Sequence, residues 1–347
     1  MKTSFRNLAV MSLSLVAISS LTGCGGGGAA APVIATDLAT AYTVTTLGAP
    51  TGQFGMEFDA ISPDGKQIVG SYTDGTYRMV FRYVNGGIQV VSPADQYIHP
   101  NNVSDSGVIA ATADTPTAQA ACMIAGNSAT IFPYGDHEVD GYSGSADSSG
   151  AIYRTARLDD GSYRSYRTQG NTSTPITVDG NENFGISSVS PSGWILGWSN
   201  SEFKAYDPIA KTWSTVLSGQ SNISARSIGN DGTIIGNQKV GANWVSFISN
   251  GSGLTNCADS TSTYATLGSI SSGGIAAGSD NIFDGNIQTY HAFAWSQASG
   301  YVDLNTRISE RNFVFSRAYG ISSNGTIVGY GIKNGTAVAC ILTPVNP

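Results

Sequence analysis

The sequence predicts an all-β protein of the β-propeller class with seven blades, and three observations support this prediction. A motif of the form Ile-Ser-x-x-Gly-x-Ile-x-Gly recurs in degenerate copies along the chain. The copies follow one another at intervals of 42, 43, 43, 39, 42 and 51 residues, a period typical of propellers and other repeat arrays. The last copy lacks one strand, whereas one isolated strand precedes the first copy. The glycines shared by the copies are Gly65, Gly107, Gly150, Gly193, Gly232, Gly274 and Gly325.

Each copy of the motif predicts a β-hairpin. An apolar residue starts a strand, Ser, Pro, Asp and Asn supply a tight turn, and a β-rich run returns. The shared glycine provides the positive φ that most residues avoid. A small residue ends each copy, which suits a place where backbones crowd together. The third copy has Ala146 and Arg154 at the apolar and the small position, so we expect a distorted unit there. The small residues are Gly70, Ala111, Gly197, Gly236, Gly278 and Gly329.

The chain begins with a leader that predicts export. Residues 1–23 combine a basic start with an apolar stretch too short for a permanent membrane span. The sequence Leu21-Thr-Gly-Cys24 resembles the bacterial lipobox, which implies acylation of Cys24; the alternative is an ordinary secretory leader. The following Gly25 favours transfer to the outer membrane. We expect residues 24–40 to form a flexible tether and residues 41–347 a single propeller domain.

Composition limits the partners. Charged residues make up only 12% of the chain, which suits many short strands and turns on an exported protein. Without the leader, 15 basic and 24 acidic residues remain, a formal charge of −9. Nucleic acid and anionic membrane surfaces are therefore poor partners, and the expected membrane contact is the lipid on Cys24. We expect a monomer.

The elements follow from the repeat. Unit one predicts four strands, and unit four repeats the plan; in unit six, residues 280–289 are expected to form a long loop before the third strand. The last unit ends after residues 337–342 without a fourth strand. The isolated strand Tyr42–Leu47 fits this vacancy, and closing the ring in this way leaves no open edge. Cys122, Cys257 and Cys340 fall in units that are not ring neighbours, so we predict no disulfide among them. We expect Cys122 and Cys340 to be buried as small apolar side chains.

One unit carries a recognisable signature. The repeat of unit six continues into His291-Ala-Phe-Ala-Trp295 and Val302-Asp-Leu304. This combination resembles the extracellular HAF-repeat family of bacteria, whose core step is followed by HAF-x-W and dLG. The other units keep only traces of the signature, and the resemblance covers residues 42–343. It implies an exported or surface-attached protein and brings no established reaction with it.

Catalytic motifs are scarce. The sequence has no G-x-S-x-G elbow and only three histidines, and we interpret His291 as a residue that holds a strand edge by hydrogen bonding. The carboxylates Asp59, Asp140 and Glu182 precede or enter inner strands and leave open a polysaccharide-acting lyase or glycosidase. Weak calcium-like loops occur at 179–183 and 280–286. We predict no catalytic residue, metal or cofactor.

The residues just ahead of and along the inner strands are the candidate binding site. Aromatic, amide and charged groups gather there, and a propeller brings them together around its axis. We therefore expect an acyl-anchored envelope protein whose propeller is a non-catalytic module for binding a glycan or a protein. The candidate residues are Asp59, Asn101, Asp140, Tyr142, Asn183, Phe184, Arg226, Tyr264, Arg317 and Tyr319.

Overall fold

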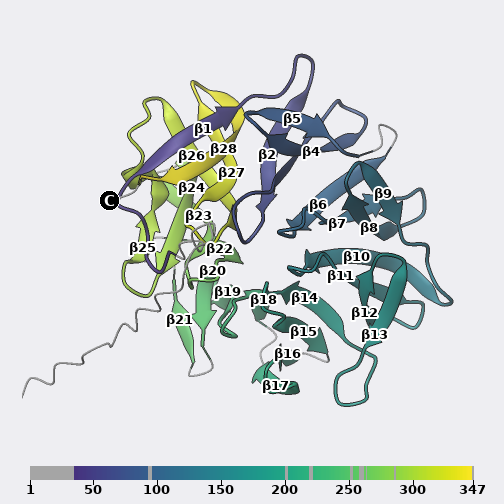
Figure 1. The fold of residues 1–347 in the computed structure, drawn as a ribbon. Helices are drawn as coiled ribbons and strands as arrows, with labels where there is room; N and C mark the ends of the chain where they lie inside the picture. Colours follow the sequence, from purple (N-terminus) through teal and green to yellow (C-terminus); the bar gives the residue numbers. More distant parts are fainter. Residues whose placement is uncertain are drawn as a thin grey trace, which may run out of the picture. The chain divides into compact units, whose positions relative to one another are not determined.

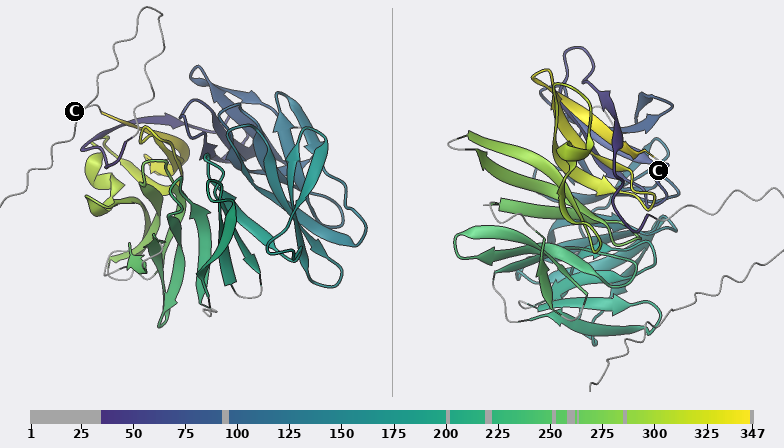
Figure 2. Two further views of the ribbon diagram at one scale, coloured as in Figure 1. Left: turned by 60° about the horizontal axis from the view of Figure 1, so that its bottom comes forward. Right: turned by 90° about the vertical axis from the view of Figure 1, so that its left-hand side faces the viewer.

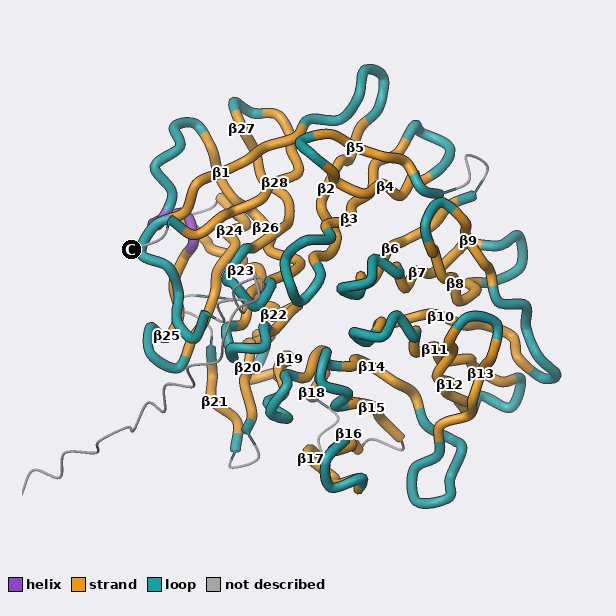
Figure 3. Tube along the Cα trace, viewed as in Figure 1, coloured by secondary structure: helices purple, strands orange, loops and turns teal. Residues whose placement is uncertain are grey.

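A computed structural model describes residues 35–345 except 93–95, 200–201, 219–221, 251–252, 258–261, 263 and 285–286. The described residues belong to one compact unit, residues 32–347. The leader, Cys24 and most of the predicted tether lie outside the described residues. Within them the chain is almost entirely strand, and the one helix, η1 (Leu304–Arg307), is a short 3-10 turn (Figure 3).

The strands succeed one another as antiparallel meanders, shown in Figure 1. The first three meanders are β2 (Phe54–Ile61), β3 (Ile68–Thr73), β4 (Arg78–Val84) and β5 (Gly87–Val90); β6 (Tyr97–Val103), β7 (Ile109–Asp114), β8 (Gln119–Ala125) and β9 (Ser128–Ile131); β10 (Glu138–Ala146), β11 (Ile152–Leu158), β12 (Tyr163–Gln169) and β13 (Thr172–Ile176). The next two are β14 (Gly185–Val189), β15 (Ile195–Ser199), β16 (Glu202–Asp207) and β17 (Thr212–Leu217); β18 (Ile223–Ile228), β19 (Ile234–Val240), β20 (Asn243–Ser249) and β21 (Leu254–Asn256). The last are β22 (Tyr264–Ile270), β23 (Ala276–Asp284), β24 (Ile287–Ser296) and β25 (Gly300–Asp303); β26 (Phe313–Ile321), β27 (Ile327–Lys333) and β28 (Thr336–Pro344), joined by β1 (Tyr42–Leu47).

These meanders form a ring. Five are separate four-stranded sheets, and the remaining eight strands make one sheet in which two meanders meet through a single parallel pair, Trp244 with Tyr264. The first strand of each meander contacts the first strand of the next, from β2 through β6, β10, β14, β18 and β22 to β26, and β26 contacts β2 again. The predicted β-propeller class is therefore confirmed, and we refer to the meanders as units one to seven in chain order.

The closing strand lies where the sequence predicts it. Strand β1 pairs antiparallel with β28 over its whole length, from Tyr42 opposite Pro344 to Leu47 opposite Ala339 (Figure 1). One further backbone bond, 3.0 Å from the Val345 amide to the Ala41 carbonyl, extends the pairing. The two ends of the described chain thus complete one sheet, and β28 has no open edge.

The repeated motif forms the same turn in every unit. All seven shared glycines have φ between +78° and +91°, and each donates its amide to the carbonyl three residues earlier at 2.9 to 3.3 Å. Glycine is required there because a Cβ disfavours this conformation. The serine of the motif caps the turn: the hydroxyls of Ser104, Ser190 and Ser271 each accept the amide of the residue that begins the return, at 3.0 to 3.1 Å.

The small residue that ends the motif lies against a bulge in the inner strand. The register shifts by one residue in all seven inner strands, so that one extra residue stands beside the small position. A Cβ on Gly329 would come within 1.9 Å of the Arg317 carbonyl oxygen, and one on Gly278 within 1.9 Å of that of Thr266. The predicted close approach is therefore real in these units. In unit three, Arg154 occupies this position and its guanidinium lies 4.1 Å from the centre of the Tyr166 ring, while the unit keeps all four strands.

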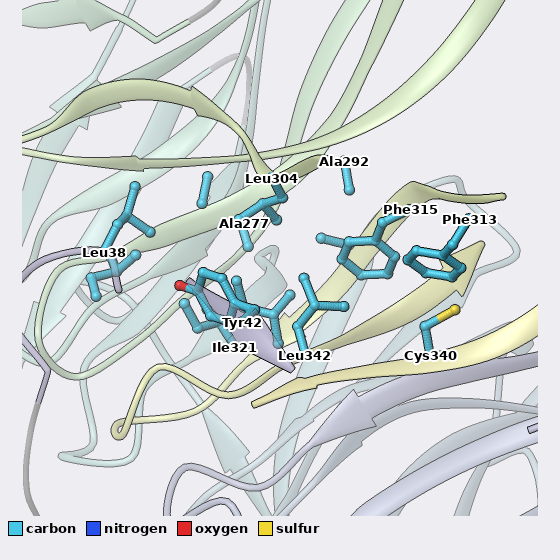
Figure 4. Packing of buried hydrophobic residues seen from close by; sticks show 14 of the residues in the cluster. Leu38, Tyr42, Ala277, Ala292, Leu304, Phe313, Phe315, Ile321, Cys340 and Leu342 are labelled. Carbon is cyan, nitrogen blue, oxygen red and sulfur yellow. The ribbon is translucent and has the colours of Figure 1, made fainter. Parts of the chain in front are cut away.

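The core is divided among the interfaces between neighbouring units. Seven clusters of buried hydrophobic residues occur in the described chain, and each joins side chains of two ring neighbours. The largest joins units six and seven and includes Tyr42 of the closing strand, which lies beside Ile321 and Leu342 (Figure 4). The apolar faces of the repeats are thus buried against one another, which is why one repeat could not fold alone. Cys122, Cys257 and Cys340 are free thiols buried in three of these clusters, and burial was predicted for Cys122 and Cys340.

Two expectations need correction. The predicted loop 280–289 is mostly strand, because β23 and β24 pair from Ala276 opposite Trp295 to Asp284 opposite Ile287. This long hairpin extends beyond its neighbours in the right-hand view of Figure 2. The described end of the predicted tether also makes specific contacts. Leu38 is buried in the largest cluster, and the Arg307 guanidinium donates to the Ala39 carbonyl at 3.0 Å.

Candidate ligand-binding site

A cavity of about 610 Å³ opens between the inner strands of units five, six and seven. Its walls come from β18, β22, β23, β24 and β26. We call it the tyrosine–arginine cavity, after Tyr264, Tyr290, Tyr319, Arg226 and Arg317. An adjoining cavity of about 560 Å³ shares Tyr290, Arg317 and Tyr319 with it. The adjoining cavity adds residues of units one, six and seven, among them Glu57, His291 and Tyr330.

The bulges of the inner strands place three of the lining residues. The register shift between Ala225 and Ser227 makes Arg226 the extra residue of β18, and the shift between Ala318 and Gly320 does the same for Tyr319 in β26. In β22 the extra residue is Gly268, which has no side chain. The bulge therefore provides two large polar groups and, between their strands, the space that a ligand needs.

The long hairpin of unit six completes the cavity. Asn281 and Tyr290 are paired opposite each other on β23 and β24, and both line it. The Arg317 guanidinium lies 4.9 Å from the centre of the Tyr290 ring, a cation–π contact that fixes both groups. Tyr290 and Tyr264 remain 40% and 45% exposed, so part of each ring is open to a ligand.

The two arginines are the cationic groups of this cavity, and the Glu57 carboxylate of the adjoining cavity interacts with the charge of Arg317 without pairing with it. In the part of the chain that the structure describes, neither Arg226 nor Arg317 forms a salt bridge. Arg226 donates through Nε to the amide oxygen of Asn237 at 3.1 Å. Asn237 is buried and donates to the Ala265 carbonyl, so it positions the arginine without cancelling its charge.

Tyr319 remains a neutral hydroxyl. Burial, together with the nearby Glu57 carboxylate, raises the pKa of Tyr319 to about 12. The group therefore keeps its proton at physiological pH and acts as a hydrogen-bond donor or acceptor, not as an anion. This leaves the guanidinium groups as the charged groups of the tyrosine–arginine cavity.

His291 lies at the edge of the adjoining cavity. Its Nδ1 is 2.6 Å from the Asp303 carboxylate on β25, the neighbouring strand of the same sheet, so the predicted strand-edge hydrogen bond is confirmed. This hydrogen bond raises the pKa of His291 above its ordinary value, although burial opposes the effect. The side chain is thus an oriented imidazole that also lines a cavity.

The ten candidate residues do not share one site. Arg226, Tyr264, Arg317 and Tyr319 line the tyrosine–arginine cavity. Asp59 and Asn101 are the bulge residues of units one and two, and their side chains are engaged by their own and neighbouring units. Asp59 binds the Ser71 hydroxyl at 2.7 Å and the Arg78 guanidinium at 3.2 Å.

The candidates of units three and four lie elsewhere. Asp140 lines a separate, shallow recess between units two and three, together with the exposed Arg157. Burial raises the pKa of Tyr142, which keeps its hydroxyl neutral. Asn183 accepts the Tyr163 amide at 3.0 Å, and Phe184 is buried in the core of units three and four, so both have structural roles instead of facing a ligand.

The three carboxylates considered for catalysis are also separated. Asp59 binds Arg78, Asp140 lines its own recess, and Glu182 pairs with Arg164 at 3.1 Å. Among the described residues no group of three or more His, Cys, Asp and Glu could hold a metal ion. In the weak calcium-like loop at 179–183, Asp179 pairs with Lys204 at 2.9 Å; the other, 280–286, lies partly outside the described residues.

Sequence reasoning missed the residues contributed by the long hairpin. Tyr290 and Asn281 fell in, or next to, a segment expected to be a loop, and Glu57 and Tyr330 stand outside the motif. The available signal was the wide interval before the last repeat, which shows that unit six has extra residues without showing that they form strands.

Comparisons with known proteins support the fold. No family model matches the chain, and no curated protein matches it. An oligogalacturonate lyase from Vibrio parahaemolyticus is similar in structure, with a TM-score of 0.55, 10% identity and coverage of 87% of this chain and 96% of that one. An oligogalacturonate lyase in complex with manganese gives 0.54 at 10% identity, covering 88% and 97%. The β-propeller domain of the Trilobed protease from Pyrococcus furiosus gives 0.53 at 11% identity, covering 73% and 81%. At such identities the likeness shows the β-propeller fold alone, and the resemblance to HAF repeats stays a prediction.

Proposed function

We propose that this chain is an exported, acyl-anchored envelope protein whose propeller binds a ligand in the tyrosine–arginine cavity without catalysing a reaction. The observation that carries the proposal is the cavity itself. Exposed tyrosine rings and two arginines that form no salt bridge among the described residues converge on one concavity of about 610 Å³, the kind of concave surface on which ligand binding depends.

The rest of the ring supports this assignment by contrast. At the equivalent bulge positions of units one and two, Asp59 and Asn101 are engaged by neighbouring protein groups. Such groups stabilise the ring and offer little to a ligand. Only in units five to seven does the described structure combine bulge residues, exposed aromatic rings and open volume.

The envelope location rests on the leader. Residues 1–23 and Cys24 lie outside the described residues, and the lipobox resemblance is the support for acylation and for an outer-membrane destination. No helix in the described part of the chain is long and apolar enough to cross a membrane. Expression of the full chain in a bacterium with a labelled fatty acid tests this part. The label should be incorporated and the protein should sediment with membranes, whereas Cys24→Ser should lose both properties.

Binding is tested on the chain from residue 24 onward with Cys24→Ser, screened against glycan and peptide arrays. We expect a restricted set of hits that is lost in Tyr290→Ala and in Arg317→Gln. Arg157→Gln is the matched control, because Arg157 is an exposed arginine in a different recess. Hits that persist in both cavity variants would move the binding site to another face, and an absence of hits on every array would refute the binding module.

A second candidate function is a polysaccharide lyase. The observation that favours it is His291, held by Asp303 at the edge of the adjoining cavity and close to Arg317 and Tyr290. A general base beside a guanidinium is the arrangement that proton abstraction next to a sugar carboxylate needs. Two of the structurally similar proteins are oligogalacturonate lyases, but that similarity concerns the fold and not the reaction. An increase in ultraviolet absorbance from an unsaturated product, present in the parent protein and absent in His291→Gln, would favour the lyase over the non-catalytic module.

A further inference from the structure

The charge of the tyrosine–arginine cavity is opposite to that of the chain. The sequence has 24 acidic and 17 basic residues, yet the described residues that line this cavity include two arginines and no carboxylate. From this asymmetry we infer that the ligand is an acidic oligosaccharide whose sugar carboxylates pair with Arg226 and Arg317. The inference rests on the proposed binding function and specifies its ligand class.

The acids closest to the cavity are held away from it. Side chains of successive residues on a strand point to opposite faces, and Ser279 and Asn281 line the cavity whereas Asp280 between them is fully buried. The Asp280 carboxylate accepts the Tyr301 hydroxyl at 3.0 Å. Glu57, in the adjoining cavity, is bonded by the Arg78 guanidinium. Asp280 is therefore turned away from both arginines. Glu57 is close enough to Arg317 to interact with its charge, but it is shared with Arg78 and forms no salt bridge with Arg317.

Arg78 in unit one is an arginine of the same ring whose charge is offset by acidic side chains. There Arg78 binds both Glu57 and Asp59, so its charge is offset within the protein. Arg226 is instead held by a neutral amide, and Arg317 lies over a tyrosine ring. Both are thus fixed in direction, and in the described structure neither forms a salt bridge. A carboxylate is the natural partner, because the planar guanidinium can bind it through two parallel hydrogen bonds.

The rest of the lining favours a sugar over a peptide. Two exposed tyrosine rings, Tyr264 and Tyr290, offer apolar faces, and Ser279 and Asn281 offer hydroxyl and amide groups for sugar hydroxyls. Extended peptides often bind by adding a strand to an open sheet edge. The inner strands β18 and β26 are paired within their sheets on one side only, but each also contacts the inner strands of the two neighbouring units, which leaves little room for an added strand. The adjoining cavity shares Tyr290 and Arg317, so together the two cavities offer room for more than one sugar ring.

The experiment compares matched ligands that differ only in charge. Short oligomers of a panel of hexuronates are titrated calorimetrically into the chain from residue 24 onward with Cys24→Ser, beside the same oligomers with their carboxyls methyl-esterified. We expect at least one free-acid oligomer to bind about 10-fold or more tightly than its ester, since charged hydrogen bonds are roughly twice as strong as neutral ones. Affinity should fall as salt is raised.

Variants locate the charge requirement. Arg226→Gln and Arg317→Gln should each weaken binding of the free acid by about 10-fold or more, with little effect on the ester. Arg317→Lys keeps the charge and should retain part of the affinity. Arg157→Gln should bind as the parent does. Circular dichroism and unfolding temperature of each variant separate lost binding from lost folding.

Several results would overturn the inference. Equal binding of acid and ester, hits confined to neutral glycans or acidic peptides, or an equal loss in Arg157→Gln would each refute an acidic sugar held by these two arginines. The proposed binding function would survive the first two results, because a ligand would still occupy the module. If neither the panel nor the glycan and peptide arrays yield any ligand, the proposed function fails as well.

Discussion

The interface between units six and seven differs from the interface between units two and three, although the same repeat builds both. The first buries fifteen hydrophobic residues in one cluster, including three of the ring's phenylalanine and tyrosine side chains. The second buries four, which are Ala110, Met123, Ala146 and Ile152. The ring therefore closes although the apolar contacts between its units are very unequal. We expect other interactions to contribute to the stability of the smaller interface.

Polar side chains supply the difference. Asn101 donates through Nδ2 to the Ser143 carbonyl of the next unit at 2.6 Å. The Ala146 amide in turn donates to the Asn102 side chain at 3.1 Å. These bonds join backbone of one unit to side chains of another, so they specify the spacing of the inner strands where few apolar groups do so. Apolar packing therefore contributes most to the interface of units six and seven, beside the paired chain ends, whereas side-chain hydrogen bonds supplement a small apolar cluster between units two and three.

The candidate cavity belongs to the well-packed side. Arg317 and Tyr319 lie on β26, whose Phe315, Ala318 and Ile321 are buried in the largest cluster. A binding site gains affinity when its groups are already fixed before the ligand arrives. We therefore expect changes in the packing of units six and seven to disturb the cavity more than changes between units two and three.

Removal of residues 35–47 should have the largest effect on stability. The truncated chain leaves β28 without its outer partner and removes Leu38 and Tyr42 from the largest cluster. We expect the unfolding temperature to fall by more than about 10 °C, or cooperative unfolding to be lost. Thermal unfolding followed by circular dichroism measures this, and an unchanged transition would show that β1 does not hold the ring closed.

Matched isoleucines test whether the two interfaces differ in energy. Ile327 and Ile152 are both fully buried, the first between units six and seven and the second between units two and three. Replacement of either by alanine should cost about 2–5 kcal/mol of unfolding free energy, and Ile327→Ala should lie nearer the upper value. The reason is that Met123, a flexible neighbour of Ile152, can move into the space, whereas the rings around Ile327 cannot. Urea unfolding decides the order, and a larger cost for Ile152→Ala would contradict it.

The polar link of the weaker interface should contribute less than a core side chain. Asn102→Ala leaves the buried Ala146 amide without its acceptor, which should cost about 1–3 kcal/mol. Asn127→Ala is the control, because Asn127 is exposed and its bond to Gln89 is a long 3.4 Å, and it should change stability by less than about 0.5 kcal/mol. Equal effects of the two variants would show that the link does not stabilise the interface.

The fold was predictable because the turn requires the same kinds of residue at the same positions of each repeat. A glycine at positive φ, a capping serine and a small residue beside the bulge are local requirements, so they recur in the sequence even where the rest of the repeat has diverged. The closing strand was predictable because the last repeat lacks one strand and the segment before the first repeat supplies one, so pairing the two completes the last sheet.

The site was predictable only in part, because side-chain direction depends on the bulge. A shift of one residue moves a side chain to the other face of its strand. Arg226 and Tyr319 are themselves bulge residues and line the cavity. Phe184 precedes β14, away from its bulge, and its ring packs into the core instead. Tyr290 lies between the repeat copy that ends at Gly278 and the signature that begins at His291, so neither pattern includes it.

The smallest expected effect concerns two of the three histidines, His291 and His99, which lie on the two sides of the comparison. His291 belongs to unit six, and the hydrogen bond that its imidazole donates to Asp303 raises its pKa. Burial lowers the pKa of His99 in unit two. Proton NMR titration should therefore place the His99 midpoint below the ordinary value and the His291 midpoint above it, and Asp303→Asn should lower the latter.

The same shifts have opposite consequences for stability. A raised pKa in the folded state means that the folded protein binds the proton more tightly than the unfolded chain does. The stabilisation by His291 is therefore fully present below its ordinary pKa and is lost as the pH rises through the raised value. The contribution of His99 has the reverse sign: it is present above the ordinary pKa and is lost as the pH falls through the lowered one. The measurement is the unfolding free energy as a function of pH. His291→Gln and His99→Gln should each abolish the pH dependence attributed to the substituted histidine. If that pH dependence remains in the variant, another group causes it.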